Sequence, residues 1–479
     1  MKKAVLMIIV VTISLALHAQ PFTWSEPINI SNLESGYSNE PSICVDSNDN
    51  IYMVWRYPSS GFEMALYFSW SDDGQTWSIP EKIYDDGGQV YGPNMVSDSV
   101  GTLYLTFEKF YADFGRVVYM NRETGVWSDP IQLSVDSLGT AFNNDIIIDN
   151  NNWVYVFWVD ADLFWTYFDG NSWSDIEVIS NITIDHQIAF PEAVVDNNND
   201  IHLVYTVFLS GPDKQTYYQK YDGNEWSNMV NISRNDTLWA INPDITVDSG
   251  NVPHIVWQQL IKVRNSNYDI YYSTLLNNNE WSNPENISNL TQLHNIRPKI
   301  QIINGRPIVF YTGEGPLFYS YHDIAGWDIN NFELDLTLGA IFDFIVDKHD
   351  IPHLAVAKIE PQLGNIYYIS SKARASIFTP EILQPTHFTI GNPYPNPFNA
   401  KAHIEFSVTR MANTSVRIYD ITGKEVAKLI DQENILPGKY ELTWDGKNKN
   451  EQIVSSGIYF FVFILEGSTL VSVKLVLFK

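Results

Sequence analysis

The sequence contains a single cysteine, Cys44, among its 479 residues. One thiol forms no disulfide within the chain and supplies too few ligands for a structural zinc site, so both frameworks are excluded. Basic residues are scarce as well: 29 Lys and Arg stand against 56 Asp and Glu, giving a formal net charge of −27. Because binding to nucleic acid or to anionic lipid requires a basic surface, we expect neither as a main partner.

Long apolar runs are missing beyond the N-terminus. No later stretch approaches the roughly 18 apolar residues that cross a bilayer, so we expect no transmembrane segment in the mature chain. Residues 1–19 begin with MKK and continue in an apolar run to Leu17, which is the pattern of a signal peptide cleaved after Ala19. The sequence therefore predicts export from the cytoplasm.

An internal repeat of about 50 residues takes the place of helical periodicity, which the sequence lacks. Tryptophan followed by Ser or Asp marks each unit, at Trp24, Trp77, Trp127, Trp173, Trp226, Trp281 and Trp327. Between these tryptophans three short β-type runs return, which read ICVD, IYMVW and ALYFSW in the first unit. Four short strands per unit are typical of a β-propeller blade. We interpret the tryptophans as residues wedged between neighbouring sheets, with stacking platforms for sugars as the alternative.

The repeat also predicts how the ring closes. Seven copies of the first three runs are present, but the last unit ends near Ser371 without a fourth strand. The segment WSEPINIS, which contains Trp24, supplies that strand from the other end of the chain. Such a strand removes the exposed edges that an open sheet would leave. The predicted fold is all-β, a seven-bladed β-propeller over residues 20–374 that is closed by an N-terminal strand.

A different pattern begins after the last repeat. Residues 375–387 are predicted to form a linker, and residues 388–479 show the apolar–polar alternation of short strands separated by turns. The simplest architecture for this second region is a small immunoglobulin-like β-sandwich. The expected order is therefore a signal peptide (1–19), a propeller (20–374), a linker (375–387) and a sandwich (388–479).

The C-terminal region carries motifs of a known sorting domain. These are PYPNPFN (393–399), VRIYDITGKEVAKL (416–429), LPGKYELTWDG (436–446), SSGIYFFVF (455–463) and the VKLVLFK tail that ends at Lys479. In this order they resemble the type A C-terminal sorting domain of the type IX secretion system. The resemblance implies that residues 388–479 are recognised by the outer-membrane translocon. It also implies a protein that is secreted or held on the outer-membrane surface, after signal-peptide-directed export to the periplasm.

A second resemblance lies in the propeller region. The segment WSDDGQTW from Trp70 to Trp77 resembles the Asp-box of sialidase-type propellers, with Asp72, Gly74 and Thr76 at matching positions. In that family the box is a turn between the third and fourth strands, away from the active site. Sialidase-like hydrolysis would require three arginines, a Tyr–Glu pair and an aspartate, and Arg56 in WRYP alone has a context like the family's.

Candidate ligand-binding residues were selected by comparing the repeats with one another. Polar positions that differ between units, at the end of the sheets where the first strands begin, point to function rather than to the scaffold. Near the starts of the first strands these are Glu40, Asn94, Asp145, Glu192, Asp244, Lys299 and Asp343. Leaving the second strands they are Arg56, Glu108, Asp160, Gln258 and Glu314. Together they predict an acidic channel mouth, with a solvated rim that binds nothing as the alternative.

No metal or catalytic residue is assigned from the sequence. The turns DSNDN at Asp46 and DNNND at Asp196 alternate oxygen ligands as a calcium loop does, but both lack the later glycine and glutamate of such a loop. Asx-rich hairpins form without metal, so no cofactor is expected, and calcium remains an open alternative. Three histidines, His202, His254 and His353, stand where other units have tyrosine, which argues against a metal triad.

The leading hypothesis is a secreted or surface propeller that binds a glycan or a protein at its acidic face. A sialidase-like exo-glycosidase is the alternative from another class. A third possibility is a propeller that serves only as a rigid display platform.

Overall fold

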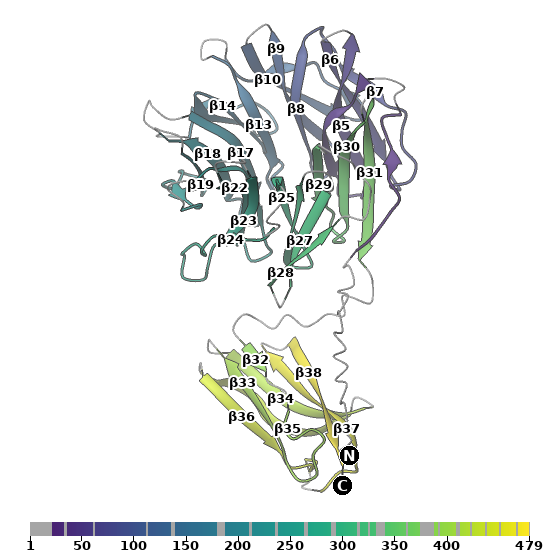
Figure 1. Ribbon diagram of the computed structural model, residues 1–479, viewed down its shortest axis with the longest axis vertical. Coiled ribbons are helices and arrows are strands. Elements are labelled where there is room, and N and C mark those ends of the chain that lie inside the picture. The colour runs from purple at the N-terminus through teal and green to yellow at the C-terminus, as the bar shows by residue number, and fades with distance from the viewer. Residues whose placement is uncertain are drawn as a thin grey trace, which may run out of the picture. The chain divides into compact units, whose positions relative to one another are not determined.

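The chain forms two units that consist of β-strands and their connections (Figure 1). The computed structural model describes residues 22–32, 36–60, 63–111, 114–135, 139–179, 187–209, 213–234, 238–262, 267–288, 294–313, 317–323, 326–331, 341–360, 363–373, 388–390, 393–408, 412–421, 424–435, 438–449, 452–465 and 468–478. The two compact units are Met1–Ala373 and Arg374–Lys479. The predicted signal peptide, residues 1–19, and the predicted linker, residues 375–387, lie outside the described residues.

Seven sheets make up the described part of the first unit, and in each the first, second and third strands are antiparallel neighbours. The first strands are β4 (Asn39–Val45), β8 (Gln89–Ser97), β13 (Phe142–Ile148), β17 (Gln187–Val195), β21 (Ala240–Val247), β25 (Ile296–Ile303) and β29 (Ile341–Val346). The second strands are β5 (Ile51–Ser60), β9 (Leu103–Tyr111), β14 (Val154–Asp160), β18 (Ile201–Phe208), β22 (Pro253–Lys262), β26 (Arg306–Thr312) and β30 (Pro352–Glu360). The third strands are β6 (Glu63–Ser71), β10 (Phe114–Glu123), β15 (Asp162–Phe168), β19 (Lys214–Tyr221), β23 (Asn267–Thr274), β27 (Leu317–Asp323) and β31 (Leu363–Ala373).

The fourth strands are short, and the last sheet takes its own from the N-terminus. In six sheets they are β7 (Glu81–Tyr84), β11 (Val126–Trp127) with β12 (Ile131–Gln132), β16 (Glu177–Val178), β20 (Val230–Asn231), β24 (Glu285–Asn286) and β28 (Gly326–Asn331). In the last sheet β1 (Phe22–Trp24) and β2 (Ile28–Asn29) pair with β31, so that Trp24 lies opposite Ser371 and Ile28 opposite Tyr368. The predicted N-terminal closing strand is therefore confirmed. A further short strand, β3 (Gly36–Tyr37), pairs with β31 in parallel.

The sheets are arranged in a ring. The first strands contact one another in a closed cycle, in which β4 contacts β8, β8 contacts β13, and so on through β17, β21, β25 and β29 back to β4. A cycle of innermost strands with a sheet extending outward from each is the architecture of a β-propeller. We call each sheet a blade, numbered by its first strand from β4 (blade 1) to β29 (blade 7).

The repeat tryptophans pack between blades, as the sequence analysis interpreted them. Each one contacts an aromatic ring on the third strand of the preceding blade. The pairs and the distances between ring centroids are Trp77–Tyr368 (5.0 Å), Trp127–Phe68 (5.3 Å), Trp173–Tyr119 (4.9 Å), Trp226–Trp165 (5.4 Å), Trp281–Tyr218 (4.8 Å), Trp327–Tyr272 (4.9 Å) and Trp24–Tyr319 (6.0 Å). Aromatic pairs of this kind add stability beyond the area that they bury.

The acidic turns use their carboxylates within the hairpin. In blade 1, Asp46 Oδ1 accepts the backbone N–H groups of Asn48 and Asn50, and Oδ2 accepts the hydroxyl of Tyr52. In blade 4 His202 takes the position of the tyrosine and contacts Asp196. Burial lowers the pKa of His202. Among the described residues, no group of three or more His, Cys, Asp and Glu is placed to hold a metal ion.

The turn after β6 differs in one residue from the sequence-based match. Asp73, rather than Asp72, accepts the N–H groups of Gln75 at 2.7 Å and Thr76 at 2.6 Å. These two backbone hydrogen bonds stabilise the ionised form and lower the pKa of Asp73 to about 2. The turn connects the third and fourth strands of its blade, where the resemblance placed it.

The second unit is a two-sheet β-sandwich. One sheet has the order β32 (Phe388–Ile390), β33 (Ala402–Val408), β36 (Gly438–Trp444), and the other the order β35 (Glu425–Ile435), β34 (Ala412–Asp420), β37 (Gly457–Leu465), β38 (Ser468–Leu477). Phe406 on the first sheet and Phe463 on the second meet in one buried core, with ring centroids 5.5 Å apart. In neither unit does the described chain contain a helix with the length and apolar character needed to cross a membrane.

Candidate ligand-binding site

Six blades share an irregularity near the start of the first strand. Here the pairing with the second strand shifts by one residue, as in a β-bulge, and one residue adopts a left-handed backbone. These residues and their φ angles are Glu40 (48°), Gly92 (49°), Asn143 (50°), Phe190 (55°), Asn242 (50°) and Arg297 (55°). We call them the bulge ring. Non-glycine residues take this conformation rarely, and bulges re-aim side chains near functional sites.

The bulge ring corrects one sequence-based assignment. The residues two positions later are Ser42, Asn94, Asp145, Glu192, Asp244 and Lys299, with Asp343 in blade 7. Sequence comparison grouped Glu40 with these, but the structure places Ser42 there and Glu40 in the bulge ring. The extra bulge residue is the cause, because it leaves no mark in the spacing of the repeats. A signal that could have found the ring is proline, which follows Glu40, Gly92, Phe190, Asn242 and Arg297.

The predicted aspartates connect neighbouring blades. Asp145 accepts the N–H groups of Ile146 and of Ala193 in the next blade at 2.9 and 2.8 Å. Asp343 does the same with Phe344 at 2.9 Å and, in blade 1, with Ile43 at 3.0 Å. Burial raises the pKa of Asp145 to about 8 and also raises that of Asp343. Asp145 is buried and Asp343 is partly exposed, and both carboxylates bond to backbone groups of the scaffold.

Lys299 lies close to two of the remaining predicted residues, Glu192 and Asp244. Its Nζ lies 2.9 Å from Glu192 Oε1 and 3.5 Å from Asp244 Oδ1. Burial would lower the pKa of Lys299, but the nearby carboxylates, Asp244 first and then Glu192, raise it well above its ordinary value. Asp244 also accepts the N–H of Ile300 at 2.6 Å, and burial raises its pKa to about 7. The charges of this group therefore compensate one another within the protein.

The residues predicted at the ends of the second strands separate into two kinds. Arg56, Glu108 and Gln258 occupy the same position of their blades, opposite residues 39, 91 and 241. Asp160 lies one residue beyond that position, in a hairpin pair with Asp162, and is buried. It does not join the other three. Glu314 lies outside the described residues.

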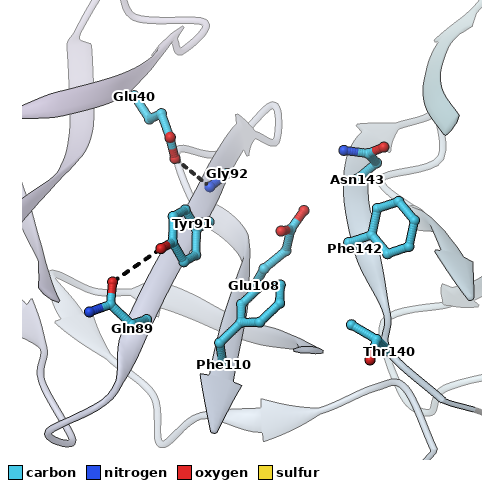
Figure 2. A pocket seen from close by; sticks show the side chains of 9 residues that line it. All are labelled: Glu40, Gln89, Tyr91, Gly92, Glu108, Phe110, Thr140, Phe142 and Asn143. Carbon is cyan, nitrogen blue, oxygen red and sulfur yellow. Dashed lines mark hydrogen bonds between the residues drawn. The ribbon is translucent and has the colours of Figure 1, made fainter. Parts of the chain in front are cut away.

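A cavity of about 610 Å³ lies where blades 1, 2 and 3 meet (Figure 2). Its lining residues are Glu40, Gln89, Tyr91, Gly92, Glu108, Phe110, Thr140, Phe142 and Asn143. Of the predicted site residues, Glu40 and Glu108 line it. The three aromatic rings and the amides were missed, because aromatic residues occur throughout the repeats and gave no contrast between blades.

Gly92 keeps the cavity open. Other described members of the bulge ring carry side chains at this position, but a Cβ added to Gly92 would meet Glu108 Oε1 and Asn144 Nδ2, both at 3.3 Å. The backbone conformation alone does not require glycine, since Glu40 and Asn143 adopt nearly the same φ. The missing side chain therefore leaves the space beside Glu108 free.

Arg56 fixes one wall of the site. Its guanidinium lies 2.8 Å from Glu40 Oε1, and its central carbon lies 4.4 Å from the centre of the Tyr91 ring. The other oxygen of Glu40 accepts the N–H of Gly92 at 2.9 Å. Tyr91 in turn donates its hydroxyl to Gln89 at 3.1 Å. An ion pair combined with ring stacking holds a tyrosine face in one orientation.

Glu108 is the buried acid of the cavity. The residue is 7% exposed, and Figure 2 shows its carboxyl group directed into the space between Tyr91 and Phe142. The donors to its Oε1 are the N–H of Asn144 at 3.3 Å and the side-chain amide of Asn144 at 3.5 Å. Burial outweighs these long hydrogen bonds and raises the pKa of Glu108 to about 7.

Comparison with known proteins supports the two folds. Residues 397–463 match the family model of the FlgD Ig-like domain, and the chain matches no curated protein. Among solved structures, an ulvan lyase of a new polysaccharide lyase family has a TM-score of 0.54 and 13% identity over 74% of this chain and 99% of that one. An α-L-arabinanase of Penicillium chrysogenum has a TM-score of 0.45 and 13% identity over 73% of this chain and 98% of that one.

At this level of identity the likeness to the lyase is one of fold. Together with the ring of sheets it establishes the first unit as a β-propeller, and the FlgD Ig-like match establishes the second as an immunoglobulin-like sandwich. The predicted all-β class, with a propeller followed by a small sandwich, is confirmed.

Proposed function

We propose that this protein is a secreted or surface-displayed propeller that binds a glycan in the cavity between blades 1, 2 and 3. The observation that carries the proposal is the composition of that cavity. Tyr91, Phe110 and Phe142 present aromatic surface, while Gln89, Thr140 and Asn143 present polar groups. Ligand sites combine mostly apolar walls with a few placed polar groups in volumes of roughly 300–1,000 Å³.

Sugars match this chemistry because each ring has both kinds of surface. The C–H groups on one face of a sugar pack against an aromatic ring, and the hydroxyls at its edge bond to amides and carboxylates. Tyr91, held by Arg56 and Gln89, is a pre-oriented platform of this kind. Pre-orientation favours binding because little side-chain freedom is lost when the ligand arrives.

The test is a binding assay on the full chain. Affinity electrophoresis against arabinan, xylan, pectin, alginate and hyaluronate would be run with wild type, Tyr91→Ala and Phe142→Ala. We expect binding of at least one polysaccharide and a loss of tenfold or more in each variant. Trp153→Ala is the matched control, because Trp153 is a partly exposed aromatic residue outside the cavity. Equal binding by wild type and both cavity variants would contradict the proposed site.

We also propose that residues 388–479 direct export through the type IX secretion system. The proposal is supported by the motif resemblance and by the sandwich fold of this region. Deleting residues 388–479 should leave the propeller in the periplasm, as measured by immunoblots of cell fractions. Normal secretion of the truncated chain would contradict this role.

A sialidase-like exo-glycosidase is the second candidate, and the arginines bear on it. Glu40 forms an ion pair with Arg56. Its charge also interacts with Arg297, where burial lowers the pKa and the attraction of Glu40 offsets part of that decrease. Other arginines are engaged elsewhere in the described chain: Arg116 bonds to the carbonyls of residues 115 and 139, and Arg234 to that of residue 281. Two arginines near one carboxylate do not make the carboxylate-binding triad, so the binding function is favoured.

A further inference from the structure

We propose that the cavity also cleaves a glycosidic bond of its ligand, with Glu108 as the residue that gives a proton to the leaving oxygen. The inference rests on the proposed glycan binding and adds an activity to it. It starts from a comparison between two equivalent positions in the same chain.

Gln258 is the counterpart of Glu108 in blade 5. Its Oε1 accepts the N–H of Arg297, in the bulge of the next blade, at 3.1 Å. Glu108 accepts the N–H of Asn144, also in the bulge of the next blade, at 3.3 Å. In blade 5 a neutral amide thus accepts the hydrogen bond from the bulge of the next blade. The same hydrogen bond does not require an acidic group at residue 108, so the carboxyl group of Glu108 has no structural explanation in this contact.

No cation pairs with Glu108 among the described residues. The cavity's other carboxylate, Glu40, has Arg56 at 2.8 Å, and the buried Asp244 has Lys299 at 3.5 Å. A buried carboxyl group without a cation retains its proton, because the charged form would be poorly solvated. The pKa of about 7 for Glu108 agrees with this argument from geometry.

The cavity therefore combines two carboxyl groups in different surroundings. Glu40 forms an ion pair with Arg56, whereas Glu108 has no cation beside it in the described chain and burial raises its pKa to about 7. Both lie against Gly92, one at its N–H and the other beside its Cα. A carboxyl group paired with a cation beside a buried carboxyl group without one is the arrangement that acid–base glycoside cleavage requires.

The reaction balances with water as the second substrate. Glu108 transfers its proton to the glycosidic oxygen while the bond from that oxygen to the anomeric carbon breaks. Water attacks the anomeric carbon and gives its proton to the Glu40 carboxylate. The products are two sugars, each with a new hydroxyl group, and the proton on Glu40 returns to Glu108 through solvent.

The experiment compares binding and cleavage on the same samples of full-length chain. Wild type, Glu108→Gln and Glu40→Gln would be incubated with the polysaccharides named above, and the release of reducing ends would be measured beside affinity electrophoresis. We expect wild type to cleave the polysaccharide that it binds. We expect Glu108→Gln to bind it with similar affinity and to cleave it at least a hundredfold more slowly, the range in which general acids contribute.

Two further readouts separate an acid from a merely structural residue. Cleavage by wild type should decrease as pH rises through about 7, because Glu108 then loses its proton. A 4-nitrophenyl glycoside of the same sugar should be cleaved by Glu108→Gln nearly as fast as by wild type, because its leaving group needs no proton. Binding by wild type without cleavage, or equal cleavage by Glu108→Gln, would overturn the inference alone. Absence of binding to every polysaccharide would overturn the proposed function and the inference together.

Discussion

The ammonium group of Lys299 lies 2.9 Å from the carboxylate of Glu192, although the two residues belong to blades that are not neighbours. Lys299 belongs to β25 and Glu192 to β17. The strand between them, β21, contributes Asp244, whose Oδ1 lies 3.5 Å from Lys299 Nζ. One cation therefore connects three first strands from inside the ring. The protein has a large excess of negative charge, and this lysine offsets part of it beside Glu192 and Asp244.

Replacing Lys299 by Met should destabilise the propeller. The substitution leaves Glu192 and Asp244 without their cation. The side chains of Lys299 and Glu192 are 31% and 29% exposed, so the cost should lie between the roughly 1 kcal/mol of an exposed pair and the roughly 3 kcal/mol of a buried one. Urea-unfolding midpoints at pH 7.5 would measure the effect. The loss should shrink at lower pH, where Asp244, whose pKa burial raises to about 7, becomes protonated, and in the double variant with Glu192→Gln.

Lys348→Met is the control for Lys299. Lys348 pairs with Asp49 at 3.2 Å, but its side chain is 50% exposed. Exposed pairs of this kind contribute about 1 kcal/mol at most. A wild-type midpoint for Lys299→Met at pH 7.5 would show that the lysine does not compensate the two carboxylates.

Glu108→Gln should change how stability depends on pH. The folded-state pKa of Glu108 is raised from 4.5 to about 7, so its contribution to stability is fully present below about pH 4.5 and is lost as pH rises through 7. The variant has no such loss. Relative to wild type it should gain about 3 kcal/mol between pH 4.5 and pH 8, since one pKa unit corresponds to about 1.4 kcal/mol.

Urea unfolding at several pH values would test this expectation. Gln is a suitable replacement because Gln258 already performs the hydrogen bonding at the equivalent position. Parallel stability curves for wild type and variant across this range would mean that Glu108 titrates as an ordinary exposed carboxyl group.

Gly92→Asn should close the cavity and leave the fold intact. Asn is accepted at this backbone conformation in Asn143 and Asn242, but its side chain would occupy the space beside Glu108. We expect a tenfold or greater loss of polysaccharide binding, with a decrease in melting temperature of a few degrees. Asn242→Gly, at the same position of a blade away from the cavity, should bind as wild type does. Undiminished binding by Gly92→Asn would place the ligand elsewhere.

Trp281→Ala should weaken the contact between blades 4 and 5. Trp281 is buried, and its ring centroid lies 4.8 Å from that of Tyr218 in the preceding blade. Removal of a large buried aromatic side chain costs about 3–5 kcal/mol. Thermal unfolding followed by near-UV circular dichroism would measure it, with Trp153→Ala as the exposed control. Similar effects of the two substitutions would contradict the wedge role of Trp281.

The sequence predicted those parts of the molecule that recur. Trp24 was recognised as the start of a closing strand because a fourth strand was missing near Ser371, and repeats make such a gap visible. The channel mouth was predicted less well, because a bulge adds one residue without changing the spacing around it. Glu40 was therefore aligned with the wrong position, and Asp160 was assigned to a cluster that it does not join.

The cavity was beyond prediction for another physical reason. It results from the absence of a side chain at Gly92, and a glycine at one point of a turn-rich repeat attracts no attention. Glu108 was selected for its charge, but its distinctive property is its burial without a cation. That property depends on its surroundings, including Asn144, which belongs to another strand and is brought close only by the fold.

The closing strand means that the propeller can close only after the whole ring has been synthesised. Ser25 bonds to Ser370, a residue 345 positions later, so the part of the propeller that emerges first from the ribosome is paired among the last. During synthesis, Phe22 and Trp24 cannot form their strand pairing until β31 has followed them. β1 can therefore pair with β31 only after all seven blades have been synthesised. A chain that ends before residue 363 lacks the strand with which β1 and β2 pair, so its ring has no closing contact.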